Sequence, residues 1–165
     1  MKYDIAVIGG GPAGMMSAGR AGQMGARVVL LEKNTQFGIK LLMTGKGRCN
    51  LTNQNSNLRE AINQFGENGK FLFSAFNRFG INDTIAFFNQ AGLKTKIERG
   101  NRVFPVSDKS ADVLATLINY LKKSKVKIKT KATVKKIIRQ NNKITKIVLM
   151  NNEEVVADQY IICTG

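Results

Sequence analysis

The chain has 165 residues, 43% of them hydrophobic, which favours one globular core of ordinary size. Its 26 lysines and arginines outnumber its 11 aspartates and glutamates, so the formal net charge is +15. No apolar run approaches the roughly 20 residues of a membrane span, and the two cysteines, Cys49 and Cys163, lie far apart. We therefore expect a reduced cytoplasmic protein, with no membrane partner, no signal peptide and no disulfide framework.

The first 32 residues carry the most specific pattern. An apolar run predicts a strand over 3–8, a helix is predicted over 12–24, and a second apolar run predicts a strand over 27–32. Between the first strand and the helix stands Gly9-Gly10-Gly11-Pro12-Ala13-Gly14, which fits the form G-x-G-x-x-G. A βαβ unit that binds the pyrophosphate of a dinucleotide typically has this order: a strand, a glycine turn, a helix, and a second strand that ends on an acidic residue.

Each residue type in this turn has a physical role. Gly9 allows a sharp turn off the strand, and Gly14 lets the helix lie close to it. Gly11 has no β-carbon, so backbone N–H groups can approach phosphate oxygens. Pro12 suits the first turn of a helix, and the N–H groups around Ala13 there face the diphosphate together with the positive end of the helix dipole.

Glu32, at the end of the second predicted strand, is placed to accept hydrogen bonds from both hydroxyls of an adenosine ribose. A carboxylate there argues against NADP, because it would repel the 2′-phosphate. NAD and FAD both have free ribose hydroxyls and stay open at this point.

The rest of the chain predicts a mixture of helices and strands. Helices are expected over 57–64 and 70–79, from a cap at Asn82 or Asp83 to Gly92, and from Ser110 onward. Strands are expected over 93–98, 126–130, 132–139, 143–150, 153–157 and 159–163. We predict a parallel sheet with 3–8 between 27–32 and 159–163, and an antiparallel meander as the crossover from 126–130 to 159–163. A meander in place of the crossover helix resembles the α/β, glutathione-reductase-like FAD-binding Rossmann fold, and we expect that fold here.

The stretch 38–53 is the second informative region. It is rich in glycine, which allows backbone amides to face a ligand, and Lys40, Lys46 and Arg48 add positive charge. The alternative interpretation of this stretch is a solvated basic loop that binds no ligand.

On these residues the chain resembles the BaiN/RdsA-type FAD-dependent oxidoreductases, often labelled aminoacetone-oxidase-like. The resemblance rests on the glycine turn, on Leu31-Glu32-Lys33, on Lys40 through Asn53 with its Gly-Arg-Cys-Asn-Leu-Thr-Asn core, on Arg102-Val103-Phe104-Pro105, and on the closing Ile161-Ile162-Cys163-Thr164-Gly165. One departure is Lys46, where we expect glycine.

The resemblance implies FAD as cofactor, NAD(P)H as a candidate electron donor, and redox chemistry on a small organic substrate. By resemblance, Glu32 binds the adenosine ribose, Lys33 beside it belongs to the cofactor site, and Val134 meets the adenine through its backbone. Lys40 and the turn Arg48-Cys49-Asn50 approach the flavin half, and Thr164 and Gly165 complete the cofactor site.

The resemblance also implies a larger protein. Residues 1–165 would be the N-terminal part of an FAD-binding domain, with a substrate domain and a closing FAD segment absent. We expect such a truncated chain to retain FAD weakly, to associate through uncovered apolar surface, and to need a second chain that carries the missing part.

No catalytic residue can be nominated. The chain has no histidine, and Thr44 stands where a flavin disulfide reductase would carry the partner of Cys49, so a redox dithiol is absent. We expect Cys49 to be a packed or cofactor-adjacent thiol, and we expect no metal site.

Two other functions stay open. An NAD-dependent dehydrogenase module shares the glycine turn, and a non-enzymatic nucleic-acid-binding module would explain the lysines. The densest lysine run, over 122–131, alternates with Val and Ile as a strand with one solvated face does, and no aromatic side chains interleave with it. We therefore expect no specific nucleic-acid partner.

Overall fold

The computed structural model describes residues 2–54 and 57–165. The chain divides into two compact units. Unit 1 comprises residues 1–41 and 117–165, and unit 2 comprises residues 42–116.

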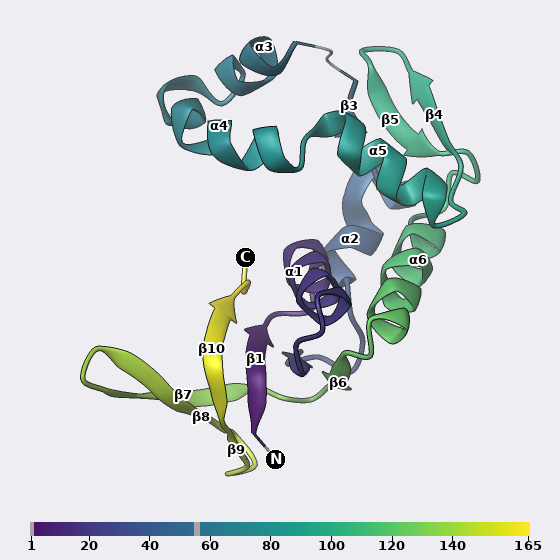
Figure 1. The fold of residues 1–165 in the computed structure, drawn as a ribbon. Helices are drawn as coiled ribbons and strands as arrows, with labels where there is room; N and C mark the ends of the chain where they lie inside the picture. The colour runs from purple at the N-terminus through teal and green to yellow at the C-terminus, as the bar shows by residue number, and fades with distance from the viewer. Residues whose placement is uncertain (1, 55–56) are drawn as a thin grey trace. The chain divides into compact units, whose positions relative to one another are not determined.

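Unit 1 is built on a parallel four-stranded sheet in the order β10-β1-β2-β6 (Figure 1). The strands are β1 (Tyr3–Ile8), β2 (Val28–Leu31), β6 (Lys127–Lys129) and β10 (Ala157–Ile162). Strand β1 pairs with β2 on one side and with β10 on the other, which confirms the predicted strand order. All four residues of β2 are buried, as expected for a strand covered on both faces.

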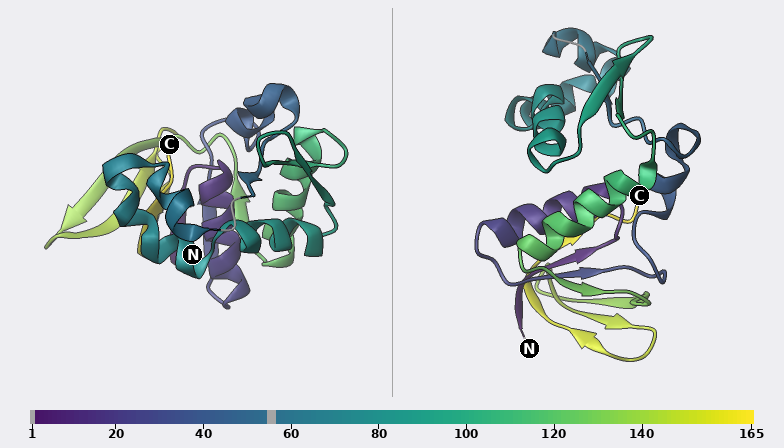
Figure 2. Two further views of the ribbon diagram at one scale, coloured as in Figure 1. Left: turned by 90° about the horizontal axis from the view of Figure 1, so that it is seen from above. Right: turned by 90° about the vertical axis from the view of Figure 1, so that its right-hand side faces the viewer.

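Two helices cover one face of this sheet, α1 (Pro12–Gln23) and the C-terminal part of α6 (Ser110–Lys123) (Figure 2). The helices pack closely because Gly19 faces the ring of Tyr120, where an added β-carbon would lie 2.2 Å from the ring. The Tyr120 hydroxyl also donates to the side chain of Gln23, at 3.3 Å. Sequence periodicity predicted both helices to within one residue at their starts.

The opposite face is covered by an antiparallel meander of β7 (Val134–Gln140), β8 (Lys143–Leu149) and β9 (Glu154–Val155). Asn141 and Asn142 form the β7–β8 turn with φ of 47° and 60°, the left-handed pair that a two-residue hairpin requires. A buried apolar cluster joins meander and sheet: Ala6, Ile8, Val29, Leu31, Ala132, Ile147, Leu149, Val155 and Ala157. The predicted meander crossover is thus confirmed.

Unit 2 contains a small antiparallel sheet in the order β3-β5-β4 and most of the remaining helices. Its strands are β3 (Thr52–Asn53), β4 (Thr95–Glu98) and β5 (Arg102–Pro105). The helices of this stretch are α2 (Ile39–Met43), η1 (Thr44–Gly47), α3 (Leu58–Asn63), η2 (Gly66–Asn68), α4 (Gly69–Arg78) and α5 (Ile81–Gln90).

The stretch from α2 to β5 differs from the sequence prediction in several features, and the short helices α2, η1 and η2 were not predicted. Strands β3 and β5 were not predicted, because runs of two and four residues carry too little alternation to be recognised. The predicted cap of α5 at Asn82 or Asp83 is wrong, since the helix begins at Ile81 after Gly80. Asp83 instead accepts a hydrogen bond from the Gly80 N–H, at 2.8 Å, as the third residue of a capping box does.

Across the described residues, no helix has the length and apolar character needed to cross a membrane.

Candidate functional site

The glycine turn after β1 allows three backbone segments of unit 1 to meet. Gly9 has φ of +110°, and a β-carbon there would lie 2.3 Å from the carbonyl oxygen of Cys163. A β-carbon on Gly14 would lie 1.8 Å from the carbonyl oxygen of Gly9. Both distances are far below van der Waals contact, so side chains at these positions would force α1 and β10 away from the turn.

Gly11 differs from its neighbours because a β-carbon there would meet no atom within 4 Å. It is the N-cap residue of α1, with ordinary extended backbone angles, and Pro12 follows in the first helical position. The first helical hydrogen bond runs from the Met15 N–H to the Gly11 carbonyl oxygen, at 2.9 Å. The N–H groups of Gly11, Ala13 and Gly14 therefore have no acceptor within the helix, and the space in front of Gly11 is open.

The Glu32 carboxylate is buried beside the turn, with 7% of the residue exposed. One of its oxygens accepts from the Gly10 N–H at 2.7 Å, and the other accepts from the backbone and side-chain nitrogens of Asn34 at 2.8 and 2.6 Å. Gly10 is equally constrained, since a β-carbon there would lie 2.2 Å from the ring of Phe37. Sequence reasoning missed Gly10, Asn34 and Phe37, because G-x-G-x-x-G leaves the second position free.

These groups surround a cavity of about 220 Å³ in unit 1. It brings together nine of the predicted cofactor residues: Gly9, Gly11, Pro12, Ala13, Glu32, Lys33, Lys40, Thr164 and Gly165. Gly14 packs behind the turn, and the half-buried Val134 packs against the core between sheet and meander. Neither residue lines the cavity.

The charges around this cavity suit an anionic ligand with a sugar attached. Lys33 and Lys40 are exposed cations in its lining, and Glu32 is the one carboxylate there. A β-carbon on Gly165 would lie 3.3 Å from Lys40 Nζ, so this ammonium group sits beside the end of the chain that follows β10. Free N–H groups, two lysines and a held carboxylate together match a diphosphate and a ribose.

The second predicted region, the loop 44–50, lies in unit 2 and has an unusual backbone. Gly45, Lys46 and Gly47 all have positive φ, of 56°, 56° and 82°, and Cys49 has φ of 61°. Lys46 thus takes a conformation that favours glycine, at the position where we expected glycine. The turn is held by hydrogen bonds from the Arg48 N–H to Gly45 and from the Cys49 N–H to the Thr44 carbonyl.

The Arg48 guanidinium is bound within unit 2. It donates to Asp108 at 2.8 and 2.5 Å and to Glu98 at 2.5 Å, and it stacks on the ring of Phe104 at 4.2 Å. Lys96 completes the cluster with ion pairs to the same two carboxylates. The pKa of Glu98 is lowered, and the hydrogen bond from Arg48 has a larger effect than that from Lys96. The pKa of Asp108 is also lowered, and there the hydrogen bond from Lys96 has the larger effect. The role of Arg48 toward a flavin stays a prediction.

Of the remaining predicted residues of this loop, Cys49 is buried and Asn50 is exposed. Cys49 is buried, and burial raises the pKa of its thiol, with a smaller opposing effect of a hydrogen bond with Thr44. With its side-chain amide oriented so that the nitrogen donates, Asn50 hydrogen-bonds to the carbonyl oxygen of Thr52 at 3.0 Å and to that of Val103 at 3.1 Å. Both cysteines are free thiols.

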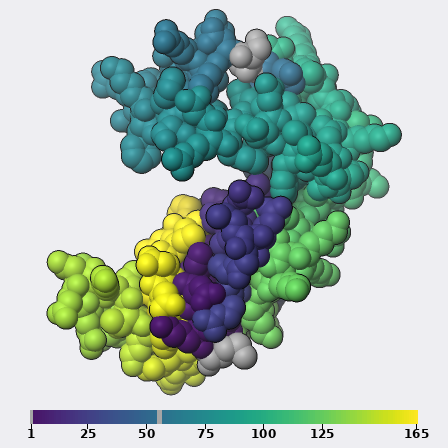
Figure 3. Space-filling model, in the orientation of Figure 1, coloured from purple at the N-terminus to yellow at the C-terminus, as the bar shows by residue number. Residues whose placement is uncertain are grey.

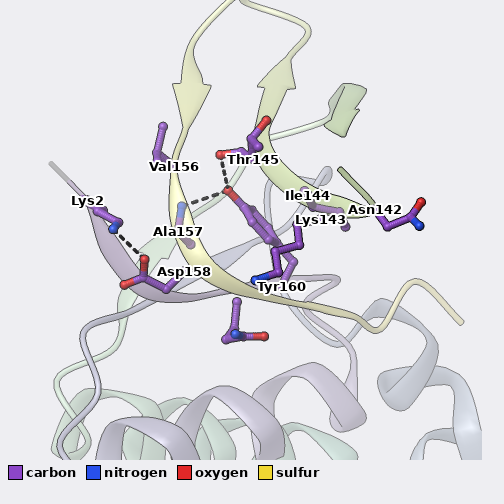
Figure 4. Close-up of a pocket in the computed structure, with 10 residues that line it drawn as sticks. Lys2, Asn142, Lys143, Ile144, Thr145, Val156, Ala157, Asp158 and Tyr160 are labelled. Atoms are coloured by element: carbon purple, nitrogen blue, oxygen red, sulfur yellow. Dashed lines mark hydrogen bonds and ion pairs between the residues drawn. The ribbon is translucent and has the colours of Figure 1, made fainter. Parts of the chain in front are cut away.

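A second hollow of unit 1, of about 640 Å³, lies where β8 meets β10 (Figure 4). Its central side chain is Tyr160, whose hydroxyl accepts from the Ala157 N–H at 2.8 Å and donates to the Thr145 carbonyl at 3.2 Å. At its rim Lys2 and Asp158 form an ion pair at 2.5 Å. Tyr160 is thus used structurally. Among the described residues, no group of three His, Cys, Asp or Glu side chains is placed to hold a metal ion.

Solved structures of other proteins share this fold. The 3-ketosteroid-delta4-(5alpha)-dehydrogenase from Rhodococcus jostii RHA1 is 16% identical, with a TM-score of 0.74 over 99% of this chain and 46% of that one. A flavocytochrome c3 fumarate reductase is 17% identical, with a TM-score of 0.76 over 99% of this chain and 34% of that one. At this identity the likeness shows a shared fold and nothing more.

Sequence relatives lie closer. The 3-dehydro-bile acid delta(4,6)-reductase of Clostridium scindens is 35% identical over 98% of this chain, and the ribosomal RNA dihydrouridine synthase of Escherichia coli is 29% identical over 99%. The chain spans about two fifths of the length of these relatives, 38% and 40%. Residues 3–165 match the family described as HI0933-like protein Rossmann domain, and with the glycine turn, the sheet order and the meander in place, the chain belongs to that family.

Proposed function

We propose that the cavity of unit 1 binds the ADP half of FAD. The observation that carries the proposal is the open space in front of Gly11, next to first-turn N–H groups that have no acceptor in the helix. The diphosphate would accept from these N–H groups, with Lys33 and Lys40 as counter-charges. The ribose would meet the Glu32 carboxylate, which Gly10 and Asn34 already hold in place.

The meander favours FAD over NAD as the dinucleotide. In this chain an antiparallel meander replaces the crossover helix between β6 and β10, an arrangement that we associate with glutathione-reductase-like FAD domains. Val134 begins that meander, where its backbone would meet the adenine. Glu32 disfavours NADP in this cavity, because its carboxylate would repel a 2′-phosphate.

We further propose that this cofactor serves a flavin-dependent oxidoreductase that acts on a small organic substrate, with NAD(P)H as the candidate electron donor. The bound flavin would supply the redox chemistry, while the residues of this chain bind and orient its nucleotide half. The two relatives named above differ in substrate class, one acting on a bile acid and the other on ribosomal RNA.

The test is the single substitution Gly11→Ala, because the new methyl group would enter open space and clash with no protein atom. Its backbone angles, φ −78° and ψ 179°, suit alanine, but alanine is a poorer N-cap residue than glycine, so we expect the free energy of unfolding to fall by no more than about 1 kcal/mol. The methyl group would stand where a phosphate must approach. We expect the Kd for FAD, measured by fluorescence titration of the full chain, to rise at least about tenfold, equivalent to 1.4 kcal/mol.

Gly25→Ala is the matched control. Gly25 has φ of +92° at the other end of α1, so alanine there should cost about 1 kcal/mol of stability and leave the FAD affinity unchanged. Unchanged FAD binding by Gly11→Ala would contradict the proposal. Binding of NADH in preference to FAD, with no flavin absorbance in the purified protein, would instead favour the NAD-dependent dehydrogenase.

A further inference from the structure

The positive charge of this chain is concentrated in one short segment. Residues 122–146 contain 11 of its 26 lysines and arginines and none of its 11 aspartates and glutamates. Outside this segment, cationic and acidic residues nearly balance over the other 140 positions. A general drift of composition toward lysine would spread the charge evenly. We expected above a merely solvated strand face, and this uneven distribution argues for a partner instead.

Much of the segment forms a hairpin, β7 and β8 with their turn at Asn141 and Asn142, which we call the basic hairpin. In its ladder, Lys136 is opposite Val148 and Ile137 is opposite the buried Ile147, and the side chains of both Lys136 and Ile137 are exposed. The ribbon and the space-filling view show the hairpin extending beyond the edge of the parallel sheet of unit 1 (Figures 1 and 3). Its cations are therefore presented away from the core.

Four cations of the basic hairpin are exposed and have no carboxylate partner in the described part of the chain: Lys135, which donates to the Asn152 side chain at 3.3 Å, Lys136, Arg139 and Lys143. The two nearby glutamates are already paired, Glu153 with Lys129 and Glu154 with Lys146. Lys143 also lines the hollow between β8 and β10, beside Asn142 of the hairpin turn (Figure 4). The hairpin is thus an uncompensated positive surface.

We propose that the basic hairpin docks the phosphodiester backbone of a nucleic acid. Residues 122–146 contain no Phe, Tyr or Trp, so the surface lacks the aromatic platforms that stack single-stranded bases and the aromatic anchors of membrane-surface helices. Lysine and arginine alone contact phosphates without reading sequence. A duplex backbone of RNA or DNA fits this chemistry. The proposal does not depend on the binding of FAD.

The experiment follows the fluorescence anisotropy of labelled RNA and DNA duplexes of about 20 base pairs, titrated with the full chain at about 50 and about 150 mM KCl. The triple substitution Lys136→Gln, Arg139→Gln and Lys143→Gln should weaken binding at least about tenfold at the lower salt concentration. Loss of three phosphate contacts should also reduce the slope of log Kd against log salt concentration by about 2–3. The RNA and DNA arms decide which duplex is preferred.

The matched control removes the same charge from unit 2, by Lys70→Gln, Arg78→Gln and Lys94→Gln, all exposed positions. The control should bind nucleic acid as the wild type does, and both variants should keep the wild-type thermal unfolding midpoint and FAD affinity. Equal weakening by both variants would show a general charge effect and overturn the proposal. Absence of duplex binding at either salt concentration, or binding only to vesicles of anionic phospholipid, would overturn it as well.

Discussion

The Glu32 carboxylate accepts a hydrogen bond of 2.7 Å from the backbone N–H of Gly10, 22 residues earlier in the chain. This bond ties the end of β2 to the glycine turn that follows β1. The carboxylate is buried and also held by Asn34, so it is fixed before any ligand arrives. Each carboxylate oxygen has two acceptor sites, and three of the four are used, so one site remains for a ribose hydroxyl, on the oxygen that binds the Gly10 N–H. One side chain therefore both shapes the turn and faces the cavity.

Replacing Glu32 should affect stability and cofactor binding together. Glu32→Ala would leave the Gly10 N–H without its acceptor, which we expect to reduce the free energy of unfolding by about 1–3 kcal/mol. FAD binding should weaken by about 1–3 kcal/mol through loss of the ribose hydrogen bond. Denaturant unfolding and FAD titration measure the two effects, and Glu67→Ala, an exposed position of η2, is the control. Full FAD affinity in Glu32→Ala would refute the ribose role.

Gly10 gives a prediction about packing alone. Gly10→Ala would place a methyl group 2.2 Å from the Phe37 ring and 2.8 Å from the Glu32 carboxylate, so we expect a loss of about 1–3 kcal/mol. Phe37→Leu removes part of that ring, and the double variant should be less destabilised than the sum of the two single changes. Additive effects in a double-mutant cycle of unfolding free energies would show that the two residues do not interact.

The sequence was sufficient where local pattern and tertiary fold agree. In unit 1 the apolar runs, the glycine turn and the Asn141-Asn142 turn led to the sheet order and the meander, because each buried strand has a distinct hydrophobic signal. Most residues of the candidate cavity followed from the spacing G-x-G-x-x-G and the acid at the end of β2. Gly10 was missed because its constraint is contact with Phe37, and no spacing rule records that contact.

Unit 2 was harder to predict, because side-chain pairing far apart in sequence organises it. Arg48 meets Asp108 and Glu98 across separations of 60 and 50 residues, and nothing in a loop rich in glycine and lysine indicates those partners. The short strands β3 and β5 pair only because the fold brings them together. Long-range ion pairs and two-residue strands leave no periodic trace in a sequence.

The Arg48 cluster should make stability depend on acid pH. The pKa values of Glu98 and Asp108 are lowered in the folded chain, so the unfolded chain binds protons at a higher pH than the folded chain does. The stabilisation is therefore complete above the ordinary carboxyl pKa near ~4 and is lost as the pH falls through the lower folded values. Arg48→Met should cost stability at pH 7, and this cost should shrink below about pH 4.

Arg102→Met is the control for this pH dependence. Arg102 lies 5.8 Å from the same Phe104 ring but bonds to the carbonyl oxygen of Arg99 rather than to a carboxylate. Its effect on unfolding, measured by denaturant titration across the same pH range, should be independent of pH. If the difference between wild type and Arg48→Met stays constant from neutral to acid pH, the ion pairs do not contribute as described.

The two cysteines should respond differently to a thiol reagent and to the cofactor. Cys49 is buried and its thiol pKa is raised by that burial, so little reactive thiolate forms and access is poor. Cys163 is half-buried and lines the candidate cavity, so we expect it to react first with a disulfide reagent such as Ellman's. FAD, and ADP at higher concentration, should slow the reaction of Cys163 and leave that of Cys49 unchanged. The variants Cys163→Ser and Cys49→Ser assign each phase of the labelling reaction to one thiol. If Cys49 is labelled faster, or if a bound nucleotide does not protect Cys163, the nucleotide lies elsewhere.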